Sequence, residues 1–266
     1  MIDQLGRVIN LDQKPSRIVS LVPSQTELLA HLSLDNEVVG ITKFCIHPEH
    51  WFISKNRIGG TKQLDLEAIY NLEPDLIIGN KEENVREQID QLSQRFPVWM
   101  SDVNSLGDAL DMIRKVSELT GKPIEGEHLA CNIEFKFLAL QEFIQTMPIR
   151  TVAYFIWKNP WMVAGNCTFI DDMLHRCGLI NCFKQLDRYP EINVEQLIKI
   201  NPELLLLSSE PFPFTQVDGE LLKSFSKKSY PILVNGEYFS WYGPRLMESV
   251  DYFMKIRLEI EQFFID

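Results

Sequence analysis

Apolar and polar positions along this chain follow a helical pattern and then a strand pattern, and one block containing both occurs twice. Residues 64–83 read LDLEAIYNLEPDLIIGNKEE, and residues 192–211 read INVEQLIKINPELLLLSSEP. In each block, apolar residues first recur at helical spacing for about two turns, which predicts a short amphipathic helix. A proline then ends the helix, and the apolar run that follows predicts a strand buried on both faces, as in a parallel sheet.

The two blocks align without a gap, and each residue of the second block lies 128 positions after its match. Glu67 matches Glu195, and Asp65 and Asn193 stand just before the predicted helices. Both are good N-cap residues, because their side chains can accept a hydrogen bond from a free amide of the first turn. An internal repeat of this kind predicts two similar lobes.

Strands alternate with helices in the rest of the chain as well. SRIVSLV leads into SQTELLAHLSL, EVVGIT follows, and RTVAYFIW, TFIDDMLHRCG and PILVNGE come later. This alternation is typical of α/β lobes whose parallel sheets are flanked by helices.

Residues 121–148 lie between the two halves and predict one long helix. A single apolar stripe runs through them, made of Leu129, Ile133, Phe137, Leu140 and Ile144. A helix of some twenty residues spans about 30 Å, and a flexible linker would be rich in Gly and Ser instead. The predicted organisation is an N-terminal α/β lobe over 1–120, a stiff connecting helix over 121–148 and a C-terminal α/β lobe over 149–266, with a ligand cleft between the lobes.

Composition and charge narrow the function classes. The chain is 45% hydrophobic and 24% charged, which is typical of a globular protein, and its net charge of −11 argues against nucleic acid and anionic membranes as partners. No apolar run approaches the roughly 18 residues of a membrane span. The N-terminus has no secretory signal, and five cysteines without paired spacing fit a reducing compartment. A mature form without its leader would look the same, so the compartment stays open.

Four segments resemble the periplasmic-binding-protein superfamily whose two lobes are joined by a single helix. RIVSLVPSQTELL resembles its first strand and helix, LDLEAIYNLEPDLII its next helix and strand, FIDDMLHRCGLINCF the first helix of its second lobe, and INVEQLIKINPELLLL the repeat. The resemblance covers nearly the whole chain, and the cobalamin-binding members look most similar. It implies a fold of the third class of these proteins, with two parallel-sheet lobes and one long helix between them.

The same resemblance implies a function. Such a protein is monomeric and performs no covalent chemistry. It holds a metal chelate (cobalamin-like, ferric-siderophore-like or haem-like) and delivers it to an ABC permease, without a built-in cofactor. A periplasmic or cell-surface location follows from the resemblance, whereas the missing leader and the cysteines fit the cytoplasm. The alternative is a cytosolic protein that handles a metal–tetrapyrrole, or a chelatase-like enzyme, although the chain has none of the common catalytic motifs.

Glu67 and Glu195 have two interpretations. Each stands in the first turn of a predicted helix, where a carboxylate is favoured by the positive end of the helix dipole. The resemblance implies instead that the two glutamates, one in each lobe, dock onto arginines of the permease.

Aromatic residues gather in loops near the strand ends of the second half. They come from YFIWKNPWM, DRYPEI and GEYFSWYGPRL, and the candidate ligand contacts among them are Trp157, Trp161, Arg188, Tyr189, Tyr238, Trp241 and Tyr242. Ligands of open α/β sheets collect at the carboxyl ends of strands, and an aromatic wall suits a large planar ligand. The alternative is ordinary core packing. Trp157, Tyr189 and Trp241 are the strongest candidates.

In the first half, Ser24 and Gln25 lie where a strand passes into a helix. Exposed amides and the Ser24 hydroxyl could bind an anionic or amide group there, or Ser24 could simply cap the helix. Lys62 in GGTKQ and Asn80 in GNKEEN lie on neighbouring loops and are further candidates. Where cobalamin-binding relatives carry tryptophans, this chain has Thr61, Asn80 and Tyr189, which implies an altered pocket.

The segment TKFCIHPEHW, residues 42–51, combines three side chains that metals accept: Cys45, His47 and His50. Their spacing matches no common zinc motif, and a closed structural site would need a fourth ligand. The segment follows the strand EVVGIT, so we expect it at the rim of the first lobe. His47 or Cys45 as the axial ligand of an already chelated metal, with Trp51 as a ligand contact, is the narrower hypothesis.

Overall fold

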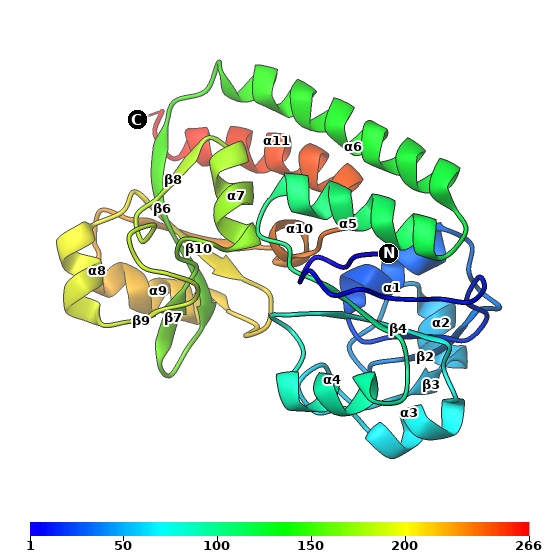
Figure 1. Ribbon diagram of the computed structural model, residues 1–266. Helices are drawn as coiled ribbons and strands as arrows, with labels where there is room; N and C mark the ends of the chain where they lie inside the picture. Colours follow the sequence, from blue (N-terminus) through cyan, green and yellow to red (C-terminus); the bar gives the residue numbers. More distant parts are fainter. Residues whose placement is uncertain (266) are drawn as a thin grey trace. The chain divides into compact units, whose positions relative to one another are not determined.

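The computed structural model describes residues 1–265, which form two compact units (Figure 1). The first unit contains residues 1–103, 107–133 and 241–245, and the second contains residues 104–106, 134–240 and the chain from 246 onward. Each unit has its own β-sheet with helices packed around it. The predicted two-lobed α/β fold is confirmed.

The first unit is built on a five-stranded sheet in the order β3-β2-β1-β4-β5, in which every neighbouring pair is parallel. Its strands are β1 (Ile18–Ser20), β2 (Val38–Ile41), β3 (Asn56–Arg57), β4 (Leu76–Asn80) and β5 (Val98–Ser101). The helices α1 (Pro23–His31), α2 (Glu49–Ser54), α3 (Leu66–Leu72) and α4 (Arg86–Ser93) connect the strands, and α5 (Leu106–Leu119) follows them. The core lies between sheet and helices, with Val19, Ile77 and Ile69 fully buried.

The second unit contains a six-stranded sheet that is mixed rather than parallel. Its strands are β6 (Arg150–Trp157), β7 (Trp161–Val163), β8 (Leu179–Asn181), β9 (Glu191–Ile192), β10 (Leu204–Ser208) and β11 (Tyr230–Val234). β8 and β10 each pair in parallel with β6, and β11 pairs in parallel with β10. β7 is antiparallel to both β6 and β9. The parallel pairs expected from the sequence are present, and β7 and β9 add antiparallel pairs to them, because the chain turns at 158–160 and returns beside β6.

Five helices accompany this second sheet. They are α7 (Phe169–Arg176), α8 (Val194–Ile200), α9 (Gln216–Phe225), α10 (Glu237–Ser240) and α11 (Leu246–Gln262). The core of the unit includes Phe155 of β6, Leu205 and Leu207 of β10, and Leu197 of α8.

The repeated sequence block forms the same local structure in both units. Asp65 caps α3 and Asn193 caps α8, each accepting a hydrogen bond from the backbone amide three residues further on, at 2.9 and 2.8 Å. Both helices end at a residue with positive φ, Glu73 or Asn201, immediately before the proline. The strands β4 and β10 then follow, so the predicted helix–strand repeat and its caps are confirmed.

The long helix expected between the halves is α6 (Pro123–Ile144), which is 22 residues long. At 1.5 Å per residue it spans about 33 Å. Residues 123–133 belong to the first unit and 134–144 to the second. Leu129, Ile133, Phe137 and Leu140 of the predicted stripe are buried. Within residues 1–265, no helix has both the length and the apolar character needed to cross a membrane.

The chain returns to the first unit near its end. The segment Trp241–Arg245 packs there, although α10 before it and α11 after it belong to the second unit. The sequence predicts this segment as part of the C-terminal lobe over 149–266, whereas it packs in the first unit. We call Trp241–Arg245 the returning segment.

Candidate functional site

The loops at the carboxyl edge of the first sheet surround its topological switch point. The sheet order places β1 between β2 and β4, and the chain leaves β1 toward β2 but later adds β4 on the other side. Ligands of open α/β sheets bind outside such a point. The segments that follow β1, β2 and β4 are therefore the relevant ones in this unit.

The segment after β1 is more buried than the sequence indicates. Gln25 is fully buried, and its amide nitrogen donates to Ser101 Oγ at 2.6 Å and to the Gly79 carbonyl at 3.2 Å. Ser24 is only 3% exposed, and the N-cap of α1 is Val22. The exposed amide site predicted here is wrong for Gln25, which joins the ends of β4 and β5, and Ser24 does not cap the helix.

Asn80 shapes the loop after β4. Its side chain is 2% exposed, donates to Ser101 Oγ at 2.9 Å, and accepts from the backbone amides of Glu82 and Glu83 at 2.8 and 3.1 Å. The polar atoms of Asn80, expected from the sequence to contact a ligand, thus bind the protein itself and hold the loop after β4. Lys62 is exposed, and its ammonium donates to the Glu82 carbonyl, which joins the loop after β3 to the loop after β4.

The returning segment lies against these loops. The Tyr242 hydroxyl donates to Glu83 Oε1 at 3.0 Å, and a Cβ on Gly243 would lie 3.0 Å from the Ser24 carbonyl oxygen. Burial, and after it the negative charge of Glu83, hold the pKa of Tyr242 well above its usual value. Tyr242 therefore stays neutral. It lies in the first unit against the loop after β4, and the neighbouring Gly243 lies against the segment after β1.

His47 and Trp241 meet at the same edge. Their rings contact edge to face with centroids 5.8 Å apart, and His47 remains half-exposed while Trp241 is buried. Trp241 also receives the Arg245 guanidinium over its ring at 4.9 Å. The imidazole is thus held by a packed partner and keeps an accessible side, as a ligand contact requires.

Cys45 is not available to a ligand. It is fully buried, with the hydroxyl oxygens of Thr26 and Thr42 each 3.1 Å from its sulfur. Burial raises the pKa of the thiol, although these hydrogen bonds oppose the effect. The thiol expected as a possible axial ligand is therefore enclosed by the protein, whereas His47 is half-exposed. Within residues 1–265, no group of three His, Cys, Asp or Glu side chains is arranged to hold a metal ion.

Trp51 and His50 turn away from the rim. Trp51 is 1% exposed, and its indole nitrogen donates to Asp35 Oδ1 at 2.7 Å, while His50 Nε2 lies 3.2 Å from the same oxygen. These two hydrogen bonds lower the pKa of Asp35. The Trp51 ring, expected from the sequence to contact a ligand, is part of the core.

In the second unit, the aromatic residues at the ends of β6 and β10 form one cluster. Trp157 is 40% exposed and contacts Phe212 edge to face at 5.7 Å. Trp161 stacks on Phe214 at 6.2 Å and contacts Phe155 at 5.8 Å. Trp157 therefore presents its ring at the carboxyl edge, whereas Trp161 reaches it through Phe214 and Phe212.

Arg188 and Tyr189 follow a tight backbone turn before β9. Arg188 has φ of 62°, and its Nη1 donates to Asn104 Oδ1 at 2.9 Å and to the Cys167 carbonyl at 2.7 Å. Both side chains are half-buried. Tyr238 is held differently, since its ring stacks on Tyr252 of α11 at 4.6 Å.

Glu67 and Glu195 occupy matching positions in the first turns of α3 and α8. Both side chains are exposed. The matched caps place one carboxylate on each unit at the same point of the repeat.

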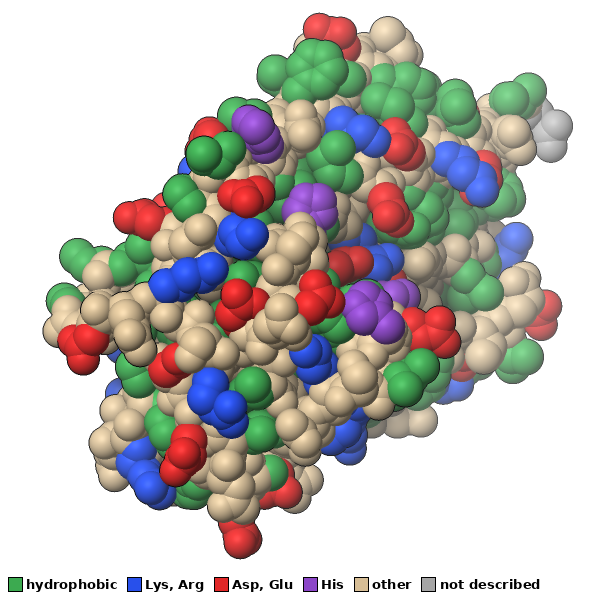
Figure 2. All heavy atoms as spheres, turned by 90° about the vertical axis from the view of Figure 1, so that its right-hand side faces the viewer, with side chains coloured by type: hydrophobic (Ala, Val, Ile, Leu, Met, Phe, Trp, Pro, Cys, Tyr) green, Lys and Arg blue, Asp and Glu red, His purple; other side chains and the backbone are tan. Residues whose placement is uncertain are grey.

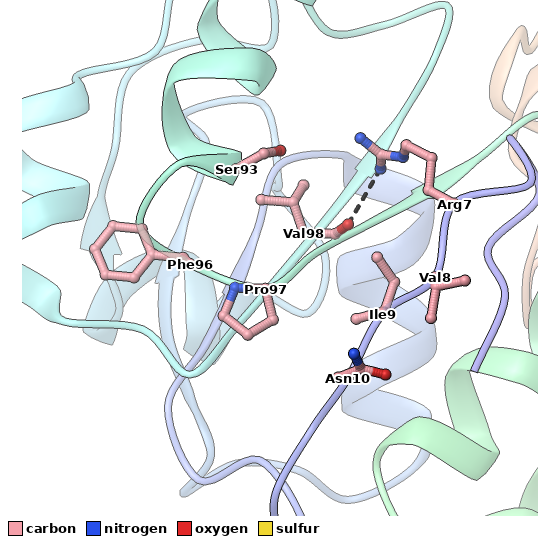
Figure 3. A pocket seen from close by; sticks show the side chains of 8 residues that line it. All are labelled: Arg7, Val8, Ile9, Asn10, Ser93, Phe96, Pro97 and Val98. Atoms are coloured by element: carbon pink, nitrogen blue, oxygen red, sulfur yellow. Dashed lines mark hydrogen bonds between the residues drawn. The ribbon is translucent and has the colours of Figure 1, made fainter.

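A separate pocket of about 240 Å³ lies in the first unit, at the start of β5 (Figure 3). Its lining comes from the N-terminal segment and from the turn between α4 and β5, and consists of Arg7, Val8, Ile9, Asn10, Ser93, Phe96, Pro97 and Val98. Arg7 points toward Val98 and donates to its carbonyl at 3.1 Å. This pocket lies at the amino end of the strand, so it is distinct from the carboxyl-edge loops.

Electrostatics at the surface are mixed. On the face drawn in Figure 2, acidic, basic and hydrophobic side chains are interspersed, and neither sign of charge dominates it. Two lysines next to candidate residues in the sequence have their charges paired with carboxylates. Lys81, after Asn80, pairs with Asp102 at 2.6 Å, and Lys158, after Trp157, pairs with Asp218 at 2.5 Å.

Two α/β units that share one long helix, with aromatic and imidazole groups at the carboxyl edges of their sheets, define a two-lobed ligand-binding protein. The family model described as periplasmic binding protein matches residues 18–228. The chain belongs to this family, whose members bind substrates and are not enzymes. The family does not support the chelatase-like alternative.

Individual relatives are distant in sequence and similar in fold. The vitamin B12-binding protein of Vibrio campbellii is 26% identical over 194 residues, which cover 72% of this chain and 70% of that protein. The apo form of a periplasmic haem-binding protein from Roseiflexus superposes with a TM-score of 0.81 at 24% identity, covering 92% of this chain and 98% of the other. The vitamin B12-binding protein of Vibrio cholerae gives 0.78 at 20% identity, with the same coverage.

Proposed function

We propose that the chain is the substrate-binding protein of an ABC-type importer and that its ligand is a metal chelate of the cobalamin, haem or ferric-siderophore type. Family membership supports the binding role, and the names of its relatives support a metal chelate as the ligand. The observation that carries the proposal is the half-exposed His47 ring packed on Trp241. Trp157 adds an exposed ring at the corresponding edge of the second sheet.

The residues divide into contacts and supports. His47, Lys62, Trp157, Arg188 and Tyr189 are at least partly exposed at the rims and are the proposed contacts. The buried or packed candidates act behind them. They are Ser24, Gln25, Asn80, Trp161, Tyr238, Trp241 and Tyr242. Large apolar chelates bind mainly by burying apolar and aromatic surface of the protein, and a few polar groups fix their orientation.

Docking to the importer uses Glu67 and Glu195 in this proposal. Their exposure and their equivalent positions in the repeat support it. Two carboxylates on separate units would meet two basic groups of a partner.

The test is equilibrium binding of wild-type protein and matched variants to cyanocobalamin, haemin and a ferric trihydroxamate. We expect one chelate to bind, and W157A to weaken it about tenfold, since one aromatic contact contributes on the order of 1.4 kcal/mol. F135A, which removes a ring that is 74% exposed on α6, is the control and should bind normally. Equal affinities for wild type and W157A would reject Trp157 as a contact.

His47 has its own matched control. H47A should change the visible spectrum of a bound haem or corrinoid if the imidazole approaches the metal, because an axial ligand alters the electronic state of the metal. H50A removes a histidine that faces Asp35 and should leave the spectrum unchanged. Identical spectra for H47A and wild type would reject the axial role.

A further inference from the structure

The segment after β2 presents two apolar side chains that the functional site described so far does not use. Cys45 is buried beneath the segment, where Thr26 and Thr42 hold its sulfur at 3.1 Å. Its neighbours on either side, Phe44 and Ile46, are 51% and 44% exposed. The buried thiol anchors the segment, and the residues before and after it face outward.

Backbone hydrogen bonds fix this conformation. The Cys45 amide donates to the Thr42 carbonyl at 3.1 Å, and the Ile46 amide donates to the Phe44 carbonyl at 2.9 Å. The Lys43 amide donates to the Gly59 carbonyl at 2.8 Å, which joins the segment to the loop after β3. The exposure of the two apolar side chains therefore comes from a supported loop.

A glycine leaves space for the Phe44 ring. A Cβ on Gly60 would lie 3.1 Å from Phe44 Cε2 and 3.3 Å from Lys43 Cε, closer than ordinary contacts. The Lys43 ammonium stands 5.2 Å from the centre of the same ring. One side of Phe44 thus rests on the loop after β3, and the rest of the ring is open.

The position of these side chains indicates what they contact. Ile46 directly precedes His47, whose ring packs on Trp241. Phe44 stands two residues before Ile46, and three of the four positions from 44 to 47, all but the buried Cys45, leave at least part of an apolar or imidazole side chain exposed. A partner protein normally needs about 800 Å² on each side, whereas a single aromatic ring and its neighbour match the face of one small planar ligand.

We propose that Phe44 and Ile46 form an apolar lip that lies against the flat ring of a macrocyclic metal chelate, next to His47. This inference rests on the proposed function and narrows its ligand class to planar macrocycles, the corrins and porphyrins, over open-chain ferric hydroxamates. The lip supplies apolar area and a fixed edge, while the half-exposed imidazole supplies the polar contact beside it.

The experiment measures the dissociation constants of cyanocobalamin, haemin and a ferric trihydroxamate for wild type, F44A/I46A, F44W and I53A. We expect wild type to bind a macrocycle, F44A/I46A to bind it at least tenfold more weakly, and F44W to stay within threefold because it keeps a flat ring. I53A removes a side chain that is 76% exposed on α2 and should behave as wild type. G60A, which pushes against the Phe44 ring, should give an intermediate loss.

The outcomes separate this inference from the proposed function. If wild type binds none of the three chelates, the proposed function fails, and the lip fails with it. If wild type binds a macrocycle and F44A/I46A binds it equally well, only the lip is overturned. Binding of the trihydroxamate alone would overturn the assignment to macrocycles. Unchanged chelate affinity in F44A/I46A together with lost binding to the permease would identify the lip as a protein-docking surface and likewise overturn the proposal.

Discussion

Arg245 and Glu27 form a two-point ion pair between residues 218 positions apart in the chain. Arg245 Nη2 lies 2.7 Å from Glu27 Oε1, and Nε lies 3.1 Å from Oε2. The side chains are only 10% and 20% exposed. Together with the hydrogen bond from Tyr242 to Glu83, this pair attaches the returning segment to α1 and to the loop after β4. That attachment fixes the position of the Trp241 ring, and with it the position of the His47 ring that packs on Trp241.

Replacing Arg245 by Met should destabilise the protein by about 2 kcal/mol, because Glu27 would keep a largely buried charge without its main partner. The double variant R245M/E27M should lose less than R245M alone, since it removes both charges. Urea unfolding of wild type, R245M, E27M and R245M/E27M measures the coupling between the two side chains. A double variant at least as unstable as R245M would show that the pair itself, rather than the stranded carboxylate, carries the stability.

Tyr242 gives a pH-dependent prediction. Its folded-state pKa is raised, so its contribution to stability is complete below the unfolded tyrosine pKa of about 10 and is lost as pH rises above it. Y242F should cost about 1 kcal/mol at pH 7, because a hydrogen bond to a carboxylate is lost.

The measurement is the free energy of unfolding of wild type and Y242F between pH 7 and pH 11. The gap between the two proteins should narrow above pH 10, since only wild type gains an ionised phenol at position 242 on unfolding. A gap that stays constant or widens would contradict the raised pKa.

The two helix caps provide a matched pair. D65A and N193A should each lose about 1 kcal/mol, because each leaves a first-turn amide of α3 or α8 without its acceptor. D65N keeps an acceptor at the same place and should stay close to wild type. Thermal or urea unfolding tests this, and a stable D65A would mean that the cap in the first unit contributes nothing.

If Glu67 and Glu195 dock onto the permease, replacing them should weaken binding to the permease and leave the stability of the protein unchanged. E67A/E195A should unfold like wild type, because both side chains are exposed, and should bind its chelate normally. Its affinity for the cognate permease should fall, and charge reversal in E67K/E195K should lower it further. Glu87, an acidic residue in the first turn of α4, provides the control variant E87A. Equal permease affinities for E67A/E195A and wild type would reject the docking role.

The repeat, its caps and the long helix could be predicted because their signals are local. A capping side chain, helical apolar spacing and a proline act within ten or so residues of the chain, and the structure forms each element where these signals place it. The hairpin after β6 was missed because an apolar strand looks the same whether its neighbour is parallel or antiparallel.

Burial at the site could not be predicted in the same way. Gln25, Cys45, Trp51 and Asn80 all follow strands and suit ligand binding by type, but partners far along the chain use their polar atoms. Which side chains turn inward depends on those non-local contacts. The roles of Glu27 and Arg245 were missed for the same reason, since only the returning segment brings them together.

The exposure of Phe44 and Ile46 could be predicted from the sequence only in part. Both flank a cysteine, one of the residue types most often buried, in the loop that follows β2. That position is a weak indication of an outward-facing pair, but Cys45, His47 and His50 in the same segment also suit metal ligation by type. The anchoring of Cys45 by two threonine hydroxyls decides between them.

Calorimetric titration of the wild-type protein decides whether this chain binds a metal chelate. Cyanocobalamin, haemin and a ferric trihydroxamate are titrated separately at neutral pH. We expect saturable binding of one macrocycle at one site per chain, with a dissociation constant in the micromolar range or tighter, equivalent to about 8 kcal/mol or more. Absence of saturable binding for all three chelates would contradict it.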